Sequence, residues 1–175
     1  MTLTFAHQGR IRKHRLYGVI YADTPLTPEI RAAVALTWDV TGNDERLHGG
    51  EESAAYRLDG HVIRVGPMKR AAAESEWCHA IARHAAGTLP EAVAPVPAPD
   101  GATVVMVAGR PISCWPYVEG EWPDSDVPAQ RAGGARLLAR LHESLATFRP
   151  PPRPVPAFQE SGLYGDPPQD APELD

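Results

Sequence analysis

The dipeptide Asp59-Gly60 separates two runs of strand-forming residues, 54–58 and 61–65, and it predicts a tight β-hairpin. Asp-Gly is typical of a two-residue hairpin turn, because both turn residues must adopt positive φ. Such a turn also fixes the register of the strands, since a shift of one residue would exchange their faces. In this register one face is mainly apolar, and the other carries Val62 and Arg64. The hairpin therefore predicts a sheet with a core on one face and a cation on the other.

Periodic apolar residues elsewhere predict three helices and a second hairpin. The helices are expected over 27–36, 69–86 and 130–146. The second hairpin is expected to join a strand over 102–107 to a strand over 112–118 through a glycine-containing turn. A helix between two hairpins indicates an α+β fold.

The two longer helices are expected to bury an apolar stripe each. On the first of them the stripe consists of Ala73, Trp77 and Ile81, with Ala80 and His84 beside them. On the second it consists of Leu138, Leu141 and Leu145. We therefore expect both helices to pack against the rest of the protein along these stripes.

The chain after Phe148 is rich in proline, and residues 150–156 cannot form a helix interior or a central strand. We expect residues 148–175 to be an extended or disordered acidic tail with few residues that could anchor it. Residues 1–26 are expected to form an N-terminal extension. The ordered part of the protein is therefore expected between these two ends.

Charge and hydropathy exclude several classes of protein. The formal net charge of −5 argues against sequence-independent binding to nucleic acid. No stretch approaches the ~18 to 20 apolar residues of a membrane span, and the N-terminus is too polar for a secretory signal. A cytoplasmic location is therefore the expectation, with Cys78 and Cys114 reduced and buried.

Five segments in order carry a resemblance to a known family. They are His48-Gly49-Gly50-Glu51-Glu52-Ser53, Val62-Ile63-Arg64-Val65, Glu74-Ser75-Glu76-Trp77-Cys78-His79-Ala80-Ile81, Tyr117-Val118-Glu119-Gly120 and Leu138-Ala139-Arg140-Leu141-His142. Their order resembles the N-terminal lobe of the aminoglycoside phosphotransferase and choline kinase-like family of small-molecule kinases, roughly over residues 27 to 146. The resemblance implies a protein kinase-like nucleotide-binding lobe over 27–120, followed by a connector and the first helix of the C-terminal lobe over 121–147.

The resemblance also implies a site for ATP or GTP. Gly49 and Gly50 would let backbone N–H groups approach a triphosphate, and Val62 would cover the adenine. Arg64 stands where related kinases place a phosphate-binding lysine. The ordinary alternatives are a simple turn and an exposed strand arginine.

Three further parts of that site follow from the resemblance. A carboxylate on the helix would hold Arg64; helical spacing permits Glu74 or Glu76, and the family register selects Glu74. Trp115 would be the gatekeeper, although a core tryptophan is the simpler account. The adenine would be bound by the carbonyl of Pro116 and the N–H of Val118.

The residues that would transfer phosphate are missing from the sequence. The family has His-Gly-Asp, an asparagine five residues after the aspartate and a later metal-binding aspartate, with Mg²⁺ as the metal. The tail offers Tyr164-Gly165-Asp166 with Ala171 in the asparagine position, so we assign no catalytic residue and no metal ligand. We expect a lobe truncated before the catalytic loop, whose complete form would phosphorylate a small-molecule hydroxyl. The alternative is a non-catalytic binding or regulatory module that reuses the lobe.

Overall fold

The structure is a computed structural model that describes residues 24–47, 53–68, 70–121 and 123–154. The predicted glycine turn with Gly49 and Gly50, most of the N-terminal extension and the tail segment with Asp166 lie outside the described residues. None of the helices in the described ranges is long and apolar enough to cross a membrane.

The described strands form one antiparallel sheet in the order β1-β2-β3-β5-β4. The strands are β1 (Glu45–Leu47), β2 (Ala54–Leu58), β3 (His61–Val65), β4 (Val105–Val107) and β5 (Arg110–Pro116). The predicted hairpin is confirmed: β2 and β3 pair with Tyr56 opposite Ile63. Asp59 and Gly60 both have positive φ, 38° and 74°, as a two-residue turn requires.

The second hairpin is tighter and shorter than the sequence predicts. Its turn is the two residues Ala108 and Gly109, with φ of 48° and 75°, and β5 already begins at Arg110. The second strand ends at Pro116 rather than Val118, because the chain leaves the sheet there. Proline has no N–H to donate, and the next amide, that of Tyr117, donates to the carbonyl of Gly60 at 2.8 Å.

The hydrophobic core lies between one face of the sheet and α1 (Pro28–Trp38). Thr27 caps this helix by accepting a hydrogen bond from the Ile30 N–H at 3.3 Å, and Pro28 begins it. Ile30 packs in the same core as Ile63 and Cys114. Each large apolar side chain buried there contributes about 1.5–3 kcal/mol relative to exposure.

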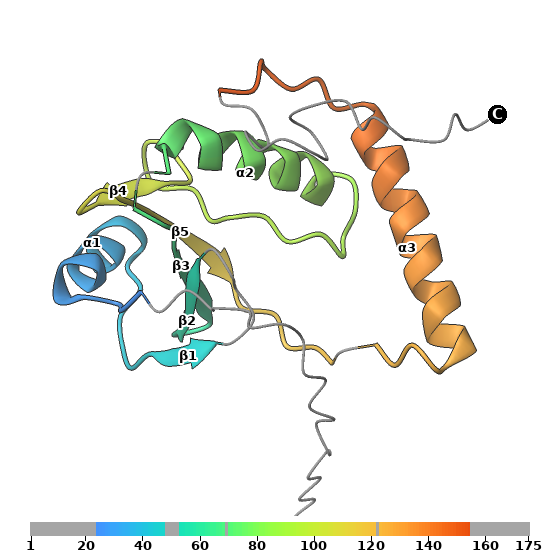
Figure 1. The fold of residues 1–175 in the computed structure, drawn as a ribbon, viewed down its shortest axis with the longest axis horizontal. Helices are drawn as coiled ribbons and strands as arrows, with labels where there is room; N and C mark the ends of the chain where they lie inside the picture. Colours follow the sequence, from blue (N-terminus) through green and yellow to red (C-terminus); the bar gives the residue numbers. More distant parts are fainter. Residues whose placement is uncertain (1–23, 48–52, 69, 122, 155–175) are drawn as a thin grey trace, which may run out of the picture.

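The helix α2 (Ala72–Ala86) lies over the opposite face of the sheet (Figure 1). The predicted stripe on this helix is wrong: Ala73 is exposed and Trp77 and Ile81 are half-buried, whereas His79 and Ala85 are buried. Compared with the predicted orientation, the helix is rotated about its axis, because the polar residues Glu76 and His79 form hydrogen bonds with Thr103.

The helix α3 (Pro128–Ala146) is attached mainly at its C-terminal end, where His84 of α2 lies 3.0 Å from the carbonyl of Ser144. The predicted buried stripe on α3 is also wrong, because no residue of this helix is buried and Leu138 is 53% exposed. Figure 1 shows the rest of α3 standing beside the sheet and α2 instead of covering them.

Candidate functional site

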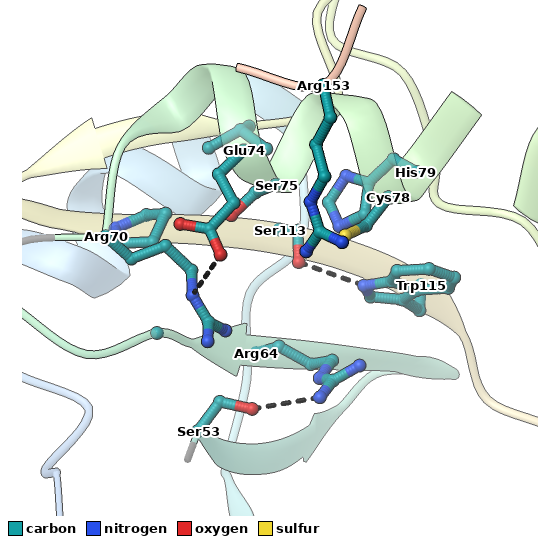
Figure 2. Close-up of a pocket in the computed structure, with 13 residues that line it drawn as sticks. Ser53, Arg64, Arg70, Glu74, Ser75, Cys78, His79, Ser113, Trp115 and Arg153 are labelled. Carbon is teal, nitrogen blue, oxygen red and sulfur yellow. Dashed lines mark hydrogen bonds and ion pairs between the residues drawn. The ribbon is translucent and has the colours of Figure 1, made fainter. Parts of the chain in front are cut away.

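A cavity of about 400 Å³ lies between α2 and the sheet face opposite the core, and Figure 2 shows its lining side chains. The lining residues are Ser53, Arg64, Gly66, Arg70, Glu74, Ser75, Cys78, His79, Val104, Pro111, Ser113, Trp115 and Arg153. This volume is in the range of small-molecule sites, which is about 300–1,000 Å³. Charged side chains and hydroxyl groups make up much of the lining, so the cavity is suited to a polar ligand.

Arg64 projects from β3 into this cavity, as the hairpin register predicts. It pairs across the strands with Ser113 of β5, so both residues share the cavity face. Its Nη2 donates to the Oγ of the buried Ser53 at 2.9 Å. A hydroxyl group orients the guanidinium without neutralising it. No ion pair of Arg64 exists within the described ranges, so its charge is available to an anion.

Glu74 also lines the cavity, but it does not pair with Arg64. Its Oε1 lies 3.8 Å from the Nε of Arg70, one turn earlier in the chain. The predicted ion pair between Arg64 and Glu74 is absent from the described part of the structure. Arg70 was not predicted as a site residue, although an arginine and a glutamate four residues apart are a recognisable ion pair of a helix surface.

Glu76, the other helix carboxylate that spacing allowed, has a different role. Its Oε1 accepts hydrogen bonds from the N–H groups of Thr103 and Val104, at 2.7 and 2.9 Å. Its Oε2 accepts from the hydroxyl of Thr103 at 2.6 Å. Glu76 therefore ties α2 to the chain that leads into β4, and it does not line the cavity.

His79 continues this network to the cavity wall. Its Nδ1 lies 2.7 Å from the Thr103 Oγ1, and since that hydroxyl donates to Glu76, Nδ1–H is the donor. The neutral ring then carries its lone pair on Nε2. Burial is the main cause that lowers the pKa of His79; Glu76 opposes this effect and Arg64 adds to it. His79 therefore favours its neutral form.

Trp115, the residue predicted as the gatekeeper, forms an aromatic wall of the cavity. Its ring meets the ring of His79 edge-on, with 5.0 Å between the centroids. Its Nε1 donates to the Ser113 Oγ at 2.9 Å, which fixes the indole plane. The partners in these two contacts, Ser113 and His79, were not among the site residues predicted from the sequence.

Three other predicted site residues, all of them described by the structure, do not line this cavity. Val62 is on the same sheet face and pairs with Trp115, but it is not part of the lining. Pro116 and Val118 also lie outside the lining, and Val118 is 63% exposed. Gly49 and Gly50 fall outside the described residues.

The start of the proline-rich tail contributes a cavity residue that was not predicted. Residues 149–154 form no helix or strand, and they contact α2. The Trp77 Nε1 donates to the Pro151 carbonyl at 2.9 Å, and the Arg153 guanidinium lies 5.0 Å from the centroid of the Trp77 ring. Figure 2 shows Arg153 pointing into the cavity from the side opposite Arg64. Sequence periodicity had assigned Trp77 to the core and so hid its role as an anchor.

The two cysteines differ in environment. Cys114 is buried as predicted, and burial raises the pKa of its thiol to about 11. Cys78 is exposed and lines the cavity, which corrects the prediction that both cysteines are buried. Within the described ranges, no group of three or more His, Cys, Asp or Glu side chains could hold a metal ion.

Comparisons with known proteins agree with this architecture. A solved structure with the same fold is that of spectinomycin phosphotransferase, APH(9)-Ia, in complex with ADP and spectinomycin. It superposes with a TM-score of 0.54 at 14% sequence identity over 66% of this chain. The chain spans 37% of the length of that protein. No curated protein sequence matches.

The sequence profile of the phosphotransferase enzyme family matches residues 44–174. This range contains β1, both hairpins, α2 and α3, and thus every described residue that lines the cavity. The α+β fold predicted from the sequence, that of a kinase-like N-terminal lobe, is confirmed by the sheet order and by the solved structure. The chain belongs to the phosphotransferase enzyme family.

Proposed function

We propose that the cavity between β3, β5 and α2 binds a purine nucleoside triphosphate, ATP or GTP. The observation that carries this proposal is Arg64, a cation without a carboxylate partner in the described structure, oriented by Ser53 toward the cavity. A guanidinium suits phosphate oxygens because its planar N–H groups can donate two parallel hydrogen bonds.

The other lining residues fit the two halves of such a ligand. The hydroxyl groups of Ser53, Ser75 and Ser113 can donate to phosphate oxygens. Among the described lining residues, Glu74 carries the single carboxylate, and it is already paired with Arg70. The indole of Trp115 offers an aromatic surface for a purine ring. Under the proposal, the Pro116 carbonyl, the Val118 N–H and the turn with Gly49 and Gly50 complete the nucleotide site, with Val62 above the base.

The complete reaction is phosphoryl transfer to a hydroxyl group of a small molecule. Mg²⁺ would supply charge stabilisation to the transferred phosphate in the complete protein. The described residues provide no cluster of three or more His, Cys, Asp or Glu side chains for that ion. We propose that this chain binds nucleotide in the cytoplasm and, because its sequence lacks the catalytic-loop motif, does not transfer phosphate by itself.

Titration calorimetry with ATP and GTP tests the nucleotide site. Arg64→Gln removes the charge that should meet the phosphates and is expected to weaken binding about ten- to hundredfold, in line with a hydrogen bond between charged groups. Arg83→Gln is the matched control, because Arg83 is an exposed arginine of α2 outside the cavity. Binding that is unchanged in Arg64→Gln would refute the proposed site.

A second candidate function is a non-catalytic binding module, which the exposed leucines of α3 favour. Leu137 and Leu138 are 39% and 53% exposed and border an apolar cavity of about 300 Å³ together with Leu89. An apolar surface of this kind is typical of a contact with another protein. Absence of any thermal shift with ATP or GTP would favour this candidate over the nucleotide site.

A further inference from the structure

Residues 149–154, which we call the proline strap, run back along α2 from its C-terminal end toward its middle (Figure 1). Just before the strap, the Phe148 ring contacts the ring of His84, with 5.0 Å between the centroids. Farther along, the carbonyl of Pro151 accepts the hydrogen bond from Trp77 at 2.9 Å. The strap is therefore held at both ends of a two-turn section of α2.

The spacing of these two contacts fits an extended proline-rich chain. A helix rises about 1.5 Å per residue, so the seven residues from Trp77 to His84 span about 10 Å. A polyproline II segment rises about 3.1 Å per residue, so three residues from Phe148 to Pro151 span about 9 Å. Proline also fixes φ before docking, which lowers the entropy lost when the strap binds α2.

The contacts of the strap place Arg153 at the mouth of the cavity. Its guanidinium lies over the Trp77 ring at 5.0 Å, and its side chain lines the cavity opposite Arg64. In the part of the chain that the structure describes, Arg153 has no carboxylate partner. Arg64 and Arg153 thus present two uncompensated positive charges to one space from two sides.

We propose that Arg153 is a phosphate-binding residue and that the proline strap closes over a bound polyphosphate. This inference extends the proposed nucleotide function by adding a ligand group from outside the lobe itself. Guanidinium groups on opposite sides of an anion can each donate to different oxygens, which two cations on one side cannot do as readily. Binding of the anion also removes the repulsion between the two cations.

The proposal makes ligand binding and strap docking mutually dependent. If the docked strap increases affinity for polyphosphate, polyphosphate must stabilise the docked strap by the same factor. The hydrogen bond from the Trp77 indole to Pro151 reports on docking, because it forms only when the strap lies on α2. Hydrogen exchange of this indole N–H, followed by NMR, therefore measures the coupling independently of any enzymatic activity.

The first experiment compares three ligands on the full 175-residue chain. ATP, tripolyphosphate and adenosine are titrated into the wild type, Arg153→Gln and Arg149→Gln. Arg149 is the matched control, because it lies in the same strap but, among the described residues, donates to the carbonyls of Ala146 and Phe148 and does not line the cavity. We expect Arg153→Gln to weaken the binding of ATP and of tripolyphosphate about tenfold and to leave the binding of adenosine unchanged. Arg149→Gln should change the affinity for each ligand less than about twofold.

The second experiment follows the Trp77 indole with and without tripolyphosphate, with the signal assigned by Trp77→Phe. Saturating ligand should slow its exchange about tenfold in the wild type and leave it unchanged in Arg153→Gln. Tighter binding of ATP by Arg153→Gln would overturn the proposal, because Arg153 would then be an obstruction. Weaker binding of adenosine would also overturn it, because Arg153 would then contact the base.

The outcomes distinguish this proposal from the nucleotide function on which it rests. ATP binding that depends on Arg64 but not on Arg153 refutes the strap and keeps the nucleotide site. Tripolyphosphate binding that depends on Arg153, without any preference for ATP, keeps the phosphate site and refutes the nucleotide function. A wild-type chain that binds neither ATP nor tripolyphosphate refutes both.

Discussion

Replacing Glu76 by alanine should destabilise the protein far more than the same change at Glu74. The Glu76 carboxylate accepts three hydrogen bonds, from the amides of Thr103 and Val104 and from the Thr103 hydroxyl. Thr103 is 0% exposed and Val104 is 8% exposed, so water cannot readily replace the lost acceptor. Each buried donor left without a partner costs about 1–3 kcal/mol. We expect Glu76→Ala to lower the free energy of unfolding by about 3–5 kcal/mol.

The control for this prediction is built into the same helix. Glu74 makes an ion pair of 3.8 Å with Arg70, with the two side chains 25% and 29% exposed. Such pairs contribute about 0–1 kcal/mol, so Glu74→Ala should change the free energy of unfolding by less than about 1 kcal/mol. Urea unfolding followed by circular dichroism measures both variants on the same scale.

If Glu76→Ala does not fold, the conservative variant Glu76→Gln tests the same hydrogen bonds. Glu76→Gln retains a carbonyl for the two amides but no longer accepts from the Thr103 hydroxyl, so we expect a loss of about 1–2 kcal/mol. A loss below about 1 kcal/mol in Glu76→Ala would refute the network as a structural element. So would equal losses in the alanine variants of Glu74 and Glu76.

Three further results are expected from the environments of single residues. Burial lowers the pKa of His79 below 6.5, so the unfolded chain binds the proton more tightly than the folded protein does. The contribution of His79 to the free energy of unfolding should therefore be complete above about pH 6.5 and decrease as the pH falls below that value. The urea midpoint of His79→Gln should depend less on acid pH than that of the wild type. A thiol reagent at pH 8 should modify Cys78 within minutes and Cys114 only after unfolding, because burial raises the Cys114 pKa to about 11. Leu138→Ala should change the free energy of unfolding by less than about 0.5 kcal/mol, whereas Ile63→Ala should cost about 2–5 kcal/mol in the same urea assay.

The parts of the fold that could be predicted from the sequence depend on neighbours along the chain. The turn at Asp59-Gly60 needs only two residues with positive φ, and it fixes every pair of the β2–β3 hairpin. That register alone places Arg64 on the face opposite the core. The first helix was predicted for the same reason, because Thr27 and Pro28 are local signals for a helix start.

The side of α2 that faces the sheet could not be predicted, because its partners lie far away in sequence. Helical periodicity counts apolar residues as buried and polar residues as exposed. In this protein His79 is buried because Thr103, 24 residues later, accepts its hydrogen bond. Glu76 faces the same way, since it binds Thr103 and Val104. Trp77 is consequently displaced toward the outside, where it contacts the proline strap.

This rotation of α2 also explains why Arg64 has no carboxylate partner among the described residues. If the helix were held to the sheet by an ion pair between Arg64 and Glu74, the carboxylate would neutralise the guanidinium in the cavity. In this structure Glu76 attaches the helix by its hydrogen bond with Thr103, and Glu74 forms its ion pair with Arg70. Arg64 is oriented instead by a neutral hydroxyl, that of Ser53. Glu76 and Thr103, which fix the helix in place, thus lie outside the cavity lining, while the positive charge of Arg64 inside the cavity has no carboxylate partner among the described residues.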